Sequence, residues 1–309
     1  MAREPDLAIL YEHESWFAPL FAVLDRRGVA WTAIRAADHR FDPAKRAPPA
    51  PVIFNRIAMS AFLRDAEHPI FYAQALFDHW QGAGARVVNG LEALQVDASK
   101  ARQLSLIARL GFLAPASRVV HRRADLFAAA AELRFPVLVK ADIGGTGAGI
   151  VKYETPDDLA AAAREGSTPV GVNGVAVVQE YAPRQGGKIT RIETLAGRFL
   201  YAIDVTAEAE TFDLCPADAC AIGRPPVAIT QAEVPESLIA AAEAIAKAAR
   251  LDVGGIEYLI DERDGSARFY DINALSNFVA GPLEVLGWDP HERLADFLQD
   301  VIKETEARS

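Results

Sequence analysis

The chain has 309 residues, of which 51% are hydrophobic, and it carries a formal net charge of −10 with two cysteines. A chain of this length can bury a core without disulfides, and two thiols are too few for a disulfide framework. The acidic balance, with no Lys/Arg run longer than two, argues against nucleic acid or an anionic membrane as the main partner. An acidic protein that binds a polyphosphate must therefore gather positive charge locally.

The N-terminal segment is predicted to begin with a buried strand. Its apolar run, Leu7–Tyr11, is too short for a signal peptide or a membrane anchor. No stretch reaches the roughly 18 apolar residues that a membrane span requires. We therefore expect a cytoplasmic protein that associates with neither membranes nor nucleic acid.

Residues 1–95 are predicted to form an N-terminal α/β lobe on a parallel sheet. Short, continuously apolar runs are typical of strands that are buried on both faces. The expected strands are residues 7–11, 31–36, 52–55 and 86–90. A helix is expected over residues 16–27, because apolar residues recur there at helical spacing and Gly28 follows as a stop.

Residues 96–183 are predicted to form a central lobe. A helix is expected over residues 97–110, with Asp97 as its N-cap and Gly111 as its stop. A second helix is expected over residues 124–134, and Thr155 followed by Pro156 is a specific start signal for a third. The expected strands are residues 117–121, 135–140, 149–153 and 175–181.

Residues 184–309 are predicted to form a C-terminal lobe. The segment 189–205 has the pattern of a hairpin with Ala196 and Gly197 at its turn. A helical stripe follows over residues 236–250. Two strands, residues 253–261 and 267–273, are then joined by a polar turn, and a last helix is expected after Asp289-Pro290.

Candidate functional residues occur in a fixed order along these elements. Phosphates require positive charge and many N–H donors, which lysines and a glycine-rich loop supply, because no Cβ keeps the loop backbone away from a ligand. The candidates are Lys100, Lys140, the loop residues Gly144, Gly145, Thr146, Gly147 and Gly149, the strand end Gln179, Glu180, Tyr181 and Ala182, and then Arg191, Glu257, Asp271 and Asn273.

Three of these residues have the chemistry of a magnesium site. Mg²⁺ prefers oxygen ligands and usually shares substrate phosphates. Asp271 and Asn273 are two apart on a predicted strand, so their side chains face the same side. Glu257 lies on the strand expected to pair with theirs, so the three oxygen ligands can converge on one point.

No other nucleotide motif fits the chain. The GxxxxGK[ST] phosphate loop does not occur in the sequence. The segment GAGARV, residues 82–87, lacks the third glycine of a dinucleotide fingerprint and follows a predicted helix. Cys215 and Cys220 have a spacing found in some zinc sites, but no further Cys pair or nearby His completes four ligands. We expect plain packing for the two cysteines, with a loop at the acceptor pocket as the alternative.

These elements together resemble the ATP-grasp superfamily, most closely its RimK-type and glutathione-synthetase-like carboxylate–amine ligases. The resemblance is clearest over residues 97–273. DASKARQLSLIARLGFLAPAS is similar to the family's linker helix, FPVLVKADIGGTGAGIVKY to its second-lysine strand and mobile phosphate loop, and VVQEYAP to its adenine hinge. GGIEYLID and FYDIN are similar to its metal-binding strands. The first 95 residues match the family's preceding lobe in pattern and length.

The resemblance implies an α/β ATP-grasp fold in which two lobes sandwich ATP and an N-terminal parallel-sheet lobe precedes them. It implies that Lys100, Lys140 and Lys188 contact the nucleotide and that residues 179–182 meet the adenine ring. Arg191, with Lys140, would stabilise charge on the transferred phosphoryl group. The predicted metal residues would hold one or two Mg²⁺ ions, for which Mn²⁺ can substitute.

The implied activity is ATP-dependent joining of a carboxylate to an amine, or to a thiol, through an acyl-phosphate, with release of ADP and phosphate. The substrates would be small molecules or a peptide tail, and a homodimer is expected. His13 and Arg56 follow two of the predicted strands. Because open α/β sheets bind ligands at the C-terminal ends of their strands, these two residues are candidates for contacts with the acceptor.

Several alternatives stay open. Lys140 could be a lysine that reaches the surface along an apolar strand, and Asp271 and Asn273 could simply end a strand. Arg191 could be an ion-pair partner of Glu193 or Glu210. A phosphotransferase, a carboxylase or a nucleotide-binding regulator would use the same ATP site, although a regulator does not need the metal ligands.

Three positions depart from the family pattern and leave the acceptor class open. Ile189 stands where the family has an acidic ribose contact. Asp204 stands where an arginine is frequent, and ALSNFVAG replaces the usual proline-glycine after Asn273.

Overall fold

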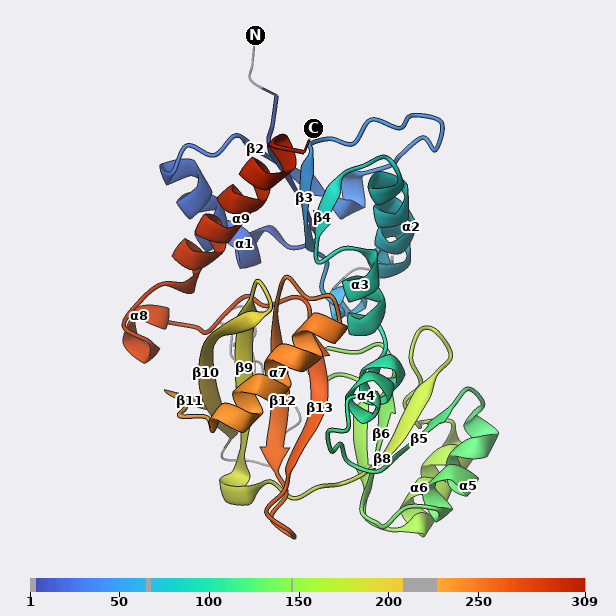
Figure 1. The fold of residues 1–309 in the computed structure, drawn as a ribbon. Helices are drawn as coiled ribbons and strands as arrows, with labels where there is room; N and C mark the ends of the chain where they lie inside the picture. Colours follow the sequence, from blue (N-terminus) through green and yellow to red (C-terminus); the bar gives the residue numbers. More distant parts are fainter. Residues whose placement is uncertain (1–3, 65–67, 146, 208–226, 309) are drawn as a thin grey trace.

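The computed structural model describes residues 4–64, 68–145, 147–207 and 227–308. Within these ranges the chain builds three β-sheets, each covered by helices, and the mixed α/β architecture predicted from the sequence is confirmed (Figure 1). None of the described helices is long and apolar enough to cross a membrane.

The first sheet is wholly parallel, in the order β2 (Trp31–Arg35), β1 (Leu7–Tyr11), β3 (Val52–Arg56) and β4 (Arg86–Val88). The helices that follow or separate these strands are α1 (Glu14–Arg26), α2 (Pro69–Gly82) and α3 (Leu91–Asp97), with 3₁₀ turns at Ala36–Asp38 and Ala61–Leu63. Leu7 and Ile9 lie in the core under α1, whereas Ala8 and Leu10 lie in the core under α2. Because strand side chains alternate between faces, both faces of β1 are buried, and its sequence is continuously apolar.

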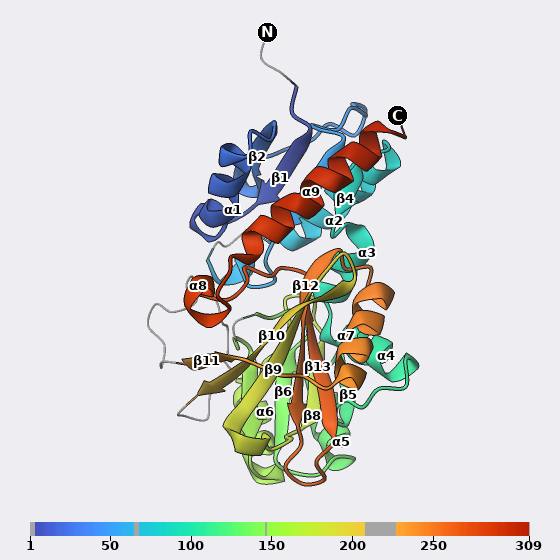
Figure 2. The same ribbon diagram turned by 60° about the vertical axis from the view of Figure 1, so that its left-hand side comes forward.

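The last helix, α9 (Pro290–Glu306), returns to the first sheet and lies beside α1 (Figure 2). Arg27, at the end of α1, forms an ion pair with Glu292 of α9. The helix begins as predicted, with Asp289 as a side-chain N-cap and Pro290 at the first helical position. The predicted division of the chain near residues 95 and 183 stays a prediction, and α9 carries the end of the chain back to the first lobe.

The second sheet is antiparallel, in the order β5 (Ser117–Val120), β8 (Ala176–Glu180), β6 (Val137–Ala141) and β7 (Ile150–Tyr153). Helices α5 (Leu126–Ala131) and α6 (Pro156–Glu165) share its core. Thr155 caps α6 reciprocally with Asp158, as its sequence signal predicts. The helix predicted over residues 124–134 is shorter than expected, because a 3₁₀ turn at Arg123–Asp125 precedes it.

The third sheet is antiparallel, in the order β11 (Val227–Gln231), β10 (Arg198–Ala207), β9 (Lys188–Leu195), β12 (Val253–Ile260) and β13 (Ala267–Asn273). Its other elements are α7 (Glu236–Ala248), α8 (Pro282–Val285) and a 3₁₀ turn at Gln185–Gly187. Helix α7 covers one face and packs on Ile192 and Ile256. The β9–β10 hairpin turns at Ala196 and Gly197, which have φ angles of 52° and 70°, as the two-residue turn requires.

The prediction that Asp97 caps one long helix is wrong. The segment forms two helices, α3 and α4 (Lys100–Arg109), and Asp97 is the buried last residue of the first. Ser99 is the N-cap of α4, since its side chain accepts a hydrogen bond from the Arg102 amide. Both residue types are good caps, so local sequence alone did not decide between them.

Asn89 joins the first lobe to the third sheet. It is fully buried and adopts a left-handed conformation with φ of 50°. Its side-chain nitrogen donates to the carbonyls of Val253 and Ala274, both at 2.6 Å, and its side-chain oxygen accepts from the amides of Asp252 and Val253. One side chain therefore satisfies four backbone groups across the joint.

Replacing Asn89 by alanine is expected to lower the free energy of unfolding by at least about 3 kcal/mol, because four buried backbone groups lose their partner. Asn89→Gly loses the same bonds but tolerates the positive φ, so it should be more stable than Asn89→Ala by roughly 1 kcal/mol. Urea denaturation measures both differences. A loss below about 1 kcal/mol in Asn89→Ala would show that the joint does not depend on this side chain.

Candidate functional site

Six of the predicted residues form one largely buried group, which we call the charged cluster: Lys100, Lys140, Arg191, Glu257, Asp271 and Asn273. Lys100 Nζ donates to Asp271 Oδ1 at 2.6 Å, and Arg191 Nη1 donates to Glu257 Oε1 at 3.0 Å. Asn273 Nδ2 lies 3.4 Å from Glu257 Oε1. Lys140 is only 7% exposed, so the alternative of a lysine that reaches the surface is wrong.

Strand register brings the acidic members together. In the antiparallel pair of β12 and β13, Glu257 lies opposite Asp271, and Gly255 lies opposite Asn273. On its other side, Glu257 of β12 lies opposite Arg191 of β9. All these side chains therefore project from the face of the sheet that α7 does not cover.

Arg191 is held over a glycine that sequence reasoning did not single out. Its Nε donates to Glu193 at 2.6 Å, so the expected alternative of an ion pair with Glu193 exists alongside the pair with Glu257. A Cβ atom on Gly255 would lie 2.4 Å from Arg191 Nε and 2.5 Å from its Cζ. The guanidinium therefore occupies the space that any other residue at position 255 would need. Two adjacent glycines inside a strand were the available signal.

Two further residues that were missed position Lys100. Gln103, which is 1% exposed, donates to the Ile272 carbonyl and accepts from the Ile272 amide. This bond pair fixes α4 against the strand segment between Asp271 and Asn273. Asp142, just after β6, accepts from the Ala101 amide at 2.8 Å and from the Ser99 hydroxyl at 3.1 Å. The start of α4 is thus tied to both sheets that carry the cluster.

Burial and mutual charge shift the pKa values of the cluster in opposite directions. Burial, with Lys100 nearby, lowers the pKa of Lys140 to about 8. Burial acts the same way on Lys100, but the charge and hydrogen bond of Asp271 outweigh it and raise the Lys100 pKa. Burial and the neighbouring Asp271 raise the pKa of Glu257. Burial opposes ionisation of Asp271 too, yet Lys100 prevails and holds its pKa low.

An apolar pocket opens beside Lys140. It is lined by Leu138, Lys140, Ile150, Gln179, Glu180, Tyr181, Ala182, Ile189, Leu259 and Tyr270, among others. The predicted hinge residues of β8 and the following turn therefore share one pocket with Lys140. The Gln179 side chain donates to the Ser117 hydroxyl, and Glu180 pairs with Arg134, so both of these side chains are engaged within the protein. Ile189, the departure at the expected ribose contact, adds an apolar wall.

The glycine-rich loop approaches the first lobe. Gly147 and Gly149 have φ angles of 73° and 72°, which favour glycine. A Cβ on Gly145 would lie 3.0 Å from the Ser60 Cβ and 3.1 Å from its backbone nitrogen. The glycine-rich loop thus lies against the segment of the first lobe that follows β3. Thr146 falls outside the described residues, as do Glu210, Cys215 and Cys220.

Two predicted residues lie apart from the charged cluster. Lys188 forms an ion pair with Asp204, which also accepts from the Thr190 hydroxyl at 2.6 Å. Lys188, Thr190 and Asp204 lie on the face of the sheet that α7 covers. Arg191 projects from the other face. His13 follows β1, where its ring stacks with Trp16 at 5.0 Å between centroids.

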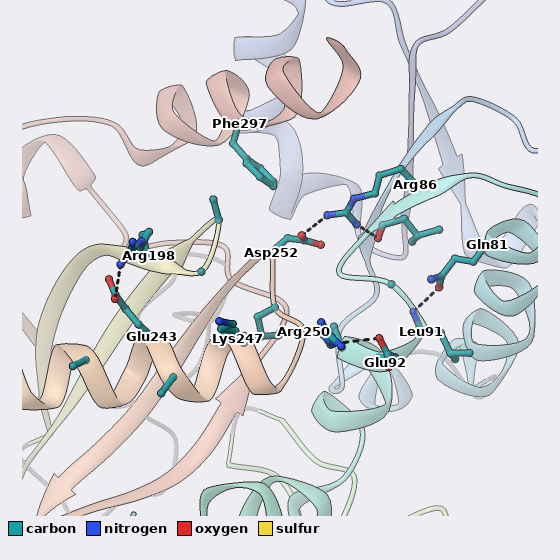
Figure 3. Close-up of a pocket in the computed structure, with 18 residues that line it drawn as sticks. Gln81, Arg86, Leu91, Glu92, Arg198, Glu243, Lys247, Arg250, Asp252 and Phe297 are labelled. Carbon is teal, nitrogen blue, oxygen red and sulfur yellow. Dashed lines mark hydrogen bonds and ion pairs between the residues drawn. The ribbon is translucent and has the colours of Figure 1, made fainter. Parts of the chain in front are cut away.

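A second, polar crevice lies elsewhere, between the first lobe, α7 and the β9–β10 turn (Figure 3). Its cavity volume is about 840 Å³, but it contains no residue of the charged cluster. Three ion pairs lie along the crevice: Arg86 with Asp252, Arg198 with Glu243, and Arg250 with Glu92. The smaller pocket next to Lys140 is therefore the one that carries the predicted chemistry.

The donor set of the cluster fits a hard cation. Across the described ranges, no group of three or more His, Cys, Asp or Glu residues is arranged to hold a metal. The cluster offers instead two carboxylates, on Glu257 and Asp271, and the amide oxygen of Asn273. All are oxygen donors of the kind Mg²⁺ prefers. Burial, and after it the nearby Asp271, raises the pKa of Glu257, so a cation between the two carboxylates would favour their charged forms.

Changing Gly255 to alanine is expected to displace the Arg191 guanidinium and leave Glu193 and Glu257 without their cation. The free energy of unfolding should fall by about 2–4 kcal/mol, from overpacking and from the broken buried pairs. Gly82→Ala, whose new Cβ would meet nothing within 4 Å, is the matched control and should be close to neutral. Urea denaturation of the two variants measures the difference, and equal stabilities would contradict the tight fit.

Comparison with known proteins agrees with this geometry. A family model described as the ATP-binding domain of the carbamoyl-phosphate synthase L chain matches residues 97–277, more than half of the chain. A search of curated proteins found no match.

Solved structures resemble the whole chain at low identity. D-alanine–D-alanine ligase from Bacillus anthracis in complex with ATP has a TM-score of 0.70 and 14% identity, over 99% of this chain and 100% of that one. A RimK domain ATP-grasp protein from Sphaerobacter thermophilus has a TM-score of 0.68 and 18% identity, over 95% and 99%. The ATP-grasp ligase PsnB, with a precursor variant, Mg and ADP, has a TM-score of 0.70 and 15% identity, over 98% and 99%.

At these identities the structures establish the fold, and the family model establishes the membership. The match begins at Asp97 and ends just past Asn273, so it spans every member of the charged cluster. The chain belongs to the ATP-grasp superfamily, in the family of carbamoyl-phosphate synthase L chain ATP-binding domains.

Proposed function

We propose that the protein is an ATP-dependent ligase that activates a substrate carboxylate as an acyl-phosphate and transfers the acyl group to an amine, or to a thiol. The observation that carries the proposal is the charged cluster, in which three cations and two carboxylates share one buried site. Such a site can receive a polyphosphate and a divalent cation together. The fold neighbours support the same class, since they include a D-alanine–D-alanine ligase and a D-cycloserine synthetase.

The nucleotide would bind between the second and third sheets. Its adenine ring would enter the apolar pocket at β8, and its phosphates would extend toward Lys140 and Lys100. A lysine is a compact point charge that can contact a phosphate oxygen. Arg191 lies on the far side of Glu257 from these lysines and would meet charge on the transferred phosphoryl group. Catalysis of this type depends mainly on positioning and on charge neutralisation.

Asp271, Glu257 and Asn273 would hold one or two Mg²⁺ ions, for which Mn²⁺ can substitute. Bound there, the metal would neutralise the β- and γ-phosphates during transfer. In the structure, Lys100 forms an ion pair with Asp271, and Arg191 forms one with Glu257. Binding of the metal–nucleotide complex would exchange these partners: the carboxylates gain the metal, and the lysine gains a phosphate.

The chemical step would proceed in two stages. A carboxylate oxygen attacks the γ-phosphorus, the bond to the β–γ bridging oxygen breaks, and ADP leaves. The amine then attacks the acyl carbon, loses a proton, and inorganic phosphate leaves. The glycine-rich loop, already close to Ser60, would cover the acyl-phosphate and exclude water.

The acceptor would lie at the first lobe, near the C-terminal ends of β1 and β3, where His13 and Arg56 are found. PsnB is solved with a precursor peptide, and the similar protein DcsG is described as a D-cycloserine synthetase. Both a peptide tail and a small molecule therefore remain within the proposal. A homodimer and a cytoplasmic location stay predictions from the sequence.

Product analysis tests the reaction class. A screen of carboxylates with amines should release ADP and phosphate in equal amounts, with a condensed product detected by mass. Asp271→Ala/Asn273→Ala should abolish this turnover while the protein stays folded, because the metal loses two of its three ligands. Release of AMP and pyrophosphate would rule out an acyl-phosphate ligase, and a phosphorylated or carboxylated product would identify the phosphotransferase or carboxylase alternative. ATP binding without any turnover would favour the remaining alternative, a nucleotide-binding regulator.

Lys140 gives a prediction with a pH dependence. Only its protonated form attracts phosphate, and its pKa is about 8 in the free protein. The affinity for Mg-ATP should therefore be full below that pH and fall as the pH rises through it. Lys140→Arg, whose guanidinium stays charged, should lose this dependence. Lys140→Met should raise the dissociation constant about ten- to a hundredfold at neutral pH, the loss of one charged hydrogen bond.

Calorimetric titration at constant salt, from about one unit below to about two units above that pKa, measures all three proteins. The same affinity in wild type and Lys140→Met would remove Lys140 from the nucleotide site.

A further inference from the structure

Arg56 is a buried cation without a counter-ion. It ends β3 and is 2% exposed. Its Nη2 donates to the Ser276 carbonyl and, at 3.0 Å, to the side-chain oxygen of Asn277. Its Nε and Nη1 atoms are buried and have no hydrogen-bond partner. Within the described residues, no carboxylate lies within ion-pair distance of this guanidinium.

The surroundings of Arg56 offset its charge only in part, through cation–π contacts with two aromatic rings and without a carboxylate. The rings of Phe17 and Phe54 lie 4.8 and 4.9 Å from the guanidinium carbon. Burial lowers the Arg56 pKa to about 9, although Glu193 and Asp97 oppose that shift. Burying an ion without a counter-ion strongly destabilises a protein. A protein with an apolar residue of similar volume at the same position is often at least as stable. The two free donors therefore point to a partner that the chain does not supply.

Glu193 shows the complementary feature. It is 1% exposed, and its Oε1 accepts from Arg191 and, at 2.8 Å, from the Ser276 hydroxyl. Its Oε2 is buried without a partner. Ser276 thus contacts both residues, Arg56 through its carbonyl and Glu193 through its hydroxyl. An unpaired donor set and an unpaired acceptor, of opposite charge, are held by one residue.

We propose that this pair binds the amine substrate through that substrate's own carboxylate, with Arg56 Nε and Nη1 donating to the carboxylate and Glu193 Oε2 accepting from the ammonium group. The amine substrate is then a free α-amino acid or the terminus of a short peptide. This inference rests on the proposed ligase function and names the acceptor class for it.

The carboxylate held by Arg56 is not the one that is phosphorylated. A reacting carboxylate must meet the γ-phosphate beside Lys100, Lys140 and Asp271. Arg56 is separated from that group by the Arg191–Glu193 ion pair, which lies between Ser276 and Glu257. The acceptor's carboxylate therefore serves for binding alone, and its amine, held at Glu193 beside Arg191, is directed toward the activated acyl group.

Titration calorimetry with a panel of free α-amino acids, each paired with its carboxamide, tests the proposal in the presence of Mg and a non-hydrolysable ATP analogue. At least one acid should bind wild type about ten- to a hundredfold more tightly than its amide, the value of a charged hydrogen bond. Arg56→Met should remove this preference and leave the affinity for the nucleotide analogue unchanged. Arg123→Met is the matched control, because Arg123 also donates to backbone carbonyls, of Gly166 and Thr168, but lies in the central lobe.

A purely structural role for Arg56 predicts different results. Arg56→Met would then unfold at a lower urea concentration than wild type, whereas the proposal predicts equal or greater stability of the ligand-free variant. Equal affinity for acids and amides, an absence of binding by every acid, or a preference that survives in Arg56→Met would each overturn the proposal. Failure of the ligase function is a separate result, because it shows as an absence of ADP release in turnover assays while acid binding persists.

Discussion

The buried charges of the cluster must be neutralised, and this requirement governs how the elements of the site come together. Lys100 belongs to α4, Lys140 to β6, and Asp271 to β13, so no single element can supply both signs. In a low-dielectric site each ion alone would cost several kcal/mol, but alternating cations and carboxylates offset that cost. The same alternation of cations and carboxylates would allow the ion-pair partners to be exchanged for a bound metal and phosphate. In the proposed function, a metal ion and a polyphosphate would bring both signs of charge, so the groups that lose a partner would gain a new one.

The scaffold around this site relies on neutral hydrogen bonds to backbone more than on further ion pairs. Gln103 holds β13 through both backbone groups of Ile272, and Asn89 holds the start of β12 and the end of β13 through four backbone groups. Side-chain amides carry both donor and acceptor without a charge, so they join elements without shifting the pKa values of the cluster. The geometry of the charges can thus be fixed independently of their titration.

Arg56 and Glu193 contrast with this well-satisfied framework. Lys100 pairs with Asp271 and Arg191 with Glu257 at hydrogen-bond distance, whereas Arg56 and Glu193 retain buried polar atoms without a partner. Unsatisfied buried groups are rare in folded proteins, so each one calls for an explanation, and a bound ligand is one such explanation. The unpaired groups lie on the side of Arg191 away from Glu257 and Asp271, which separates a proposed acceptor side from a proposed nucleotide side.

The sequence by itself determined most of the elements and the spacing of the candidate residues along them, because these depend on local signals. The apolar run of β1, the Thr155-Pro156 start, the Ala196-Gly197 turn and the two-residue spacing of Asp271 and Asn273 each act within a few residues. The strand alternation that placed Lys188 and Arg191 on opposite faces was equally readable, since the two are three residues apart. Only the tertiary structure decided that Ser99 rather than Asp97 caps α4, that α9 returns to the first lobe, that Gly255 leaves space for Arg191, and that Arg56 lacks a counter-ion. Each of these depends on what distant segments bring to the same place, and contacts between distant segments are not encoded in local spacing.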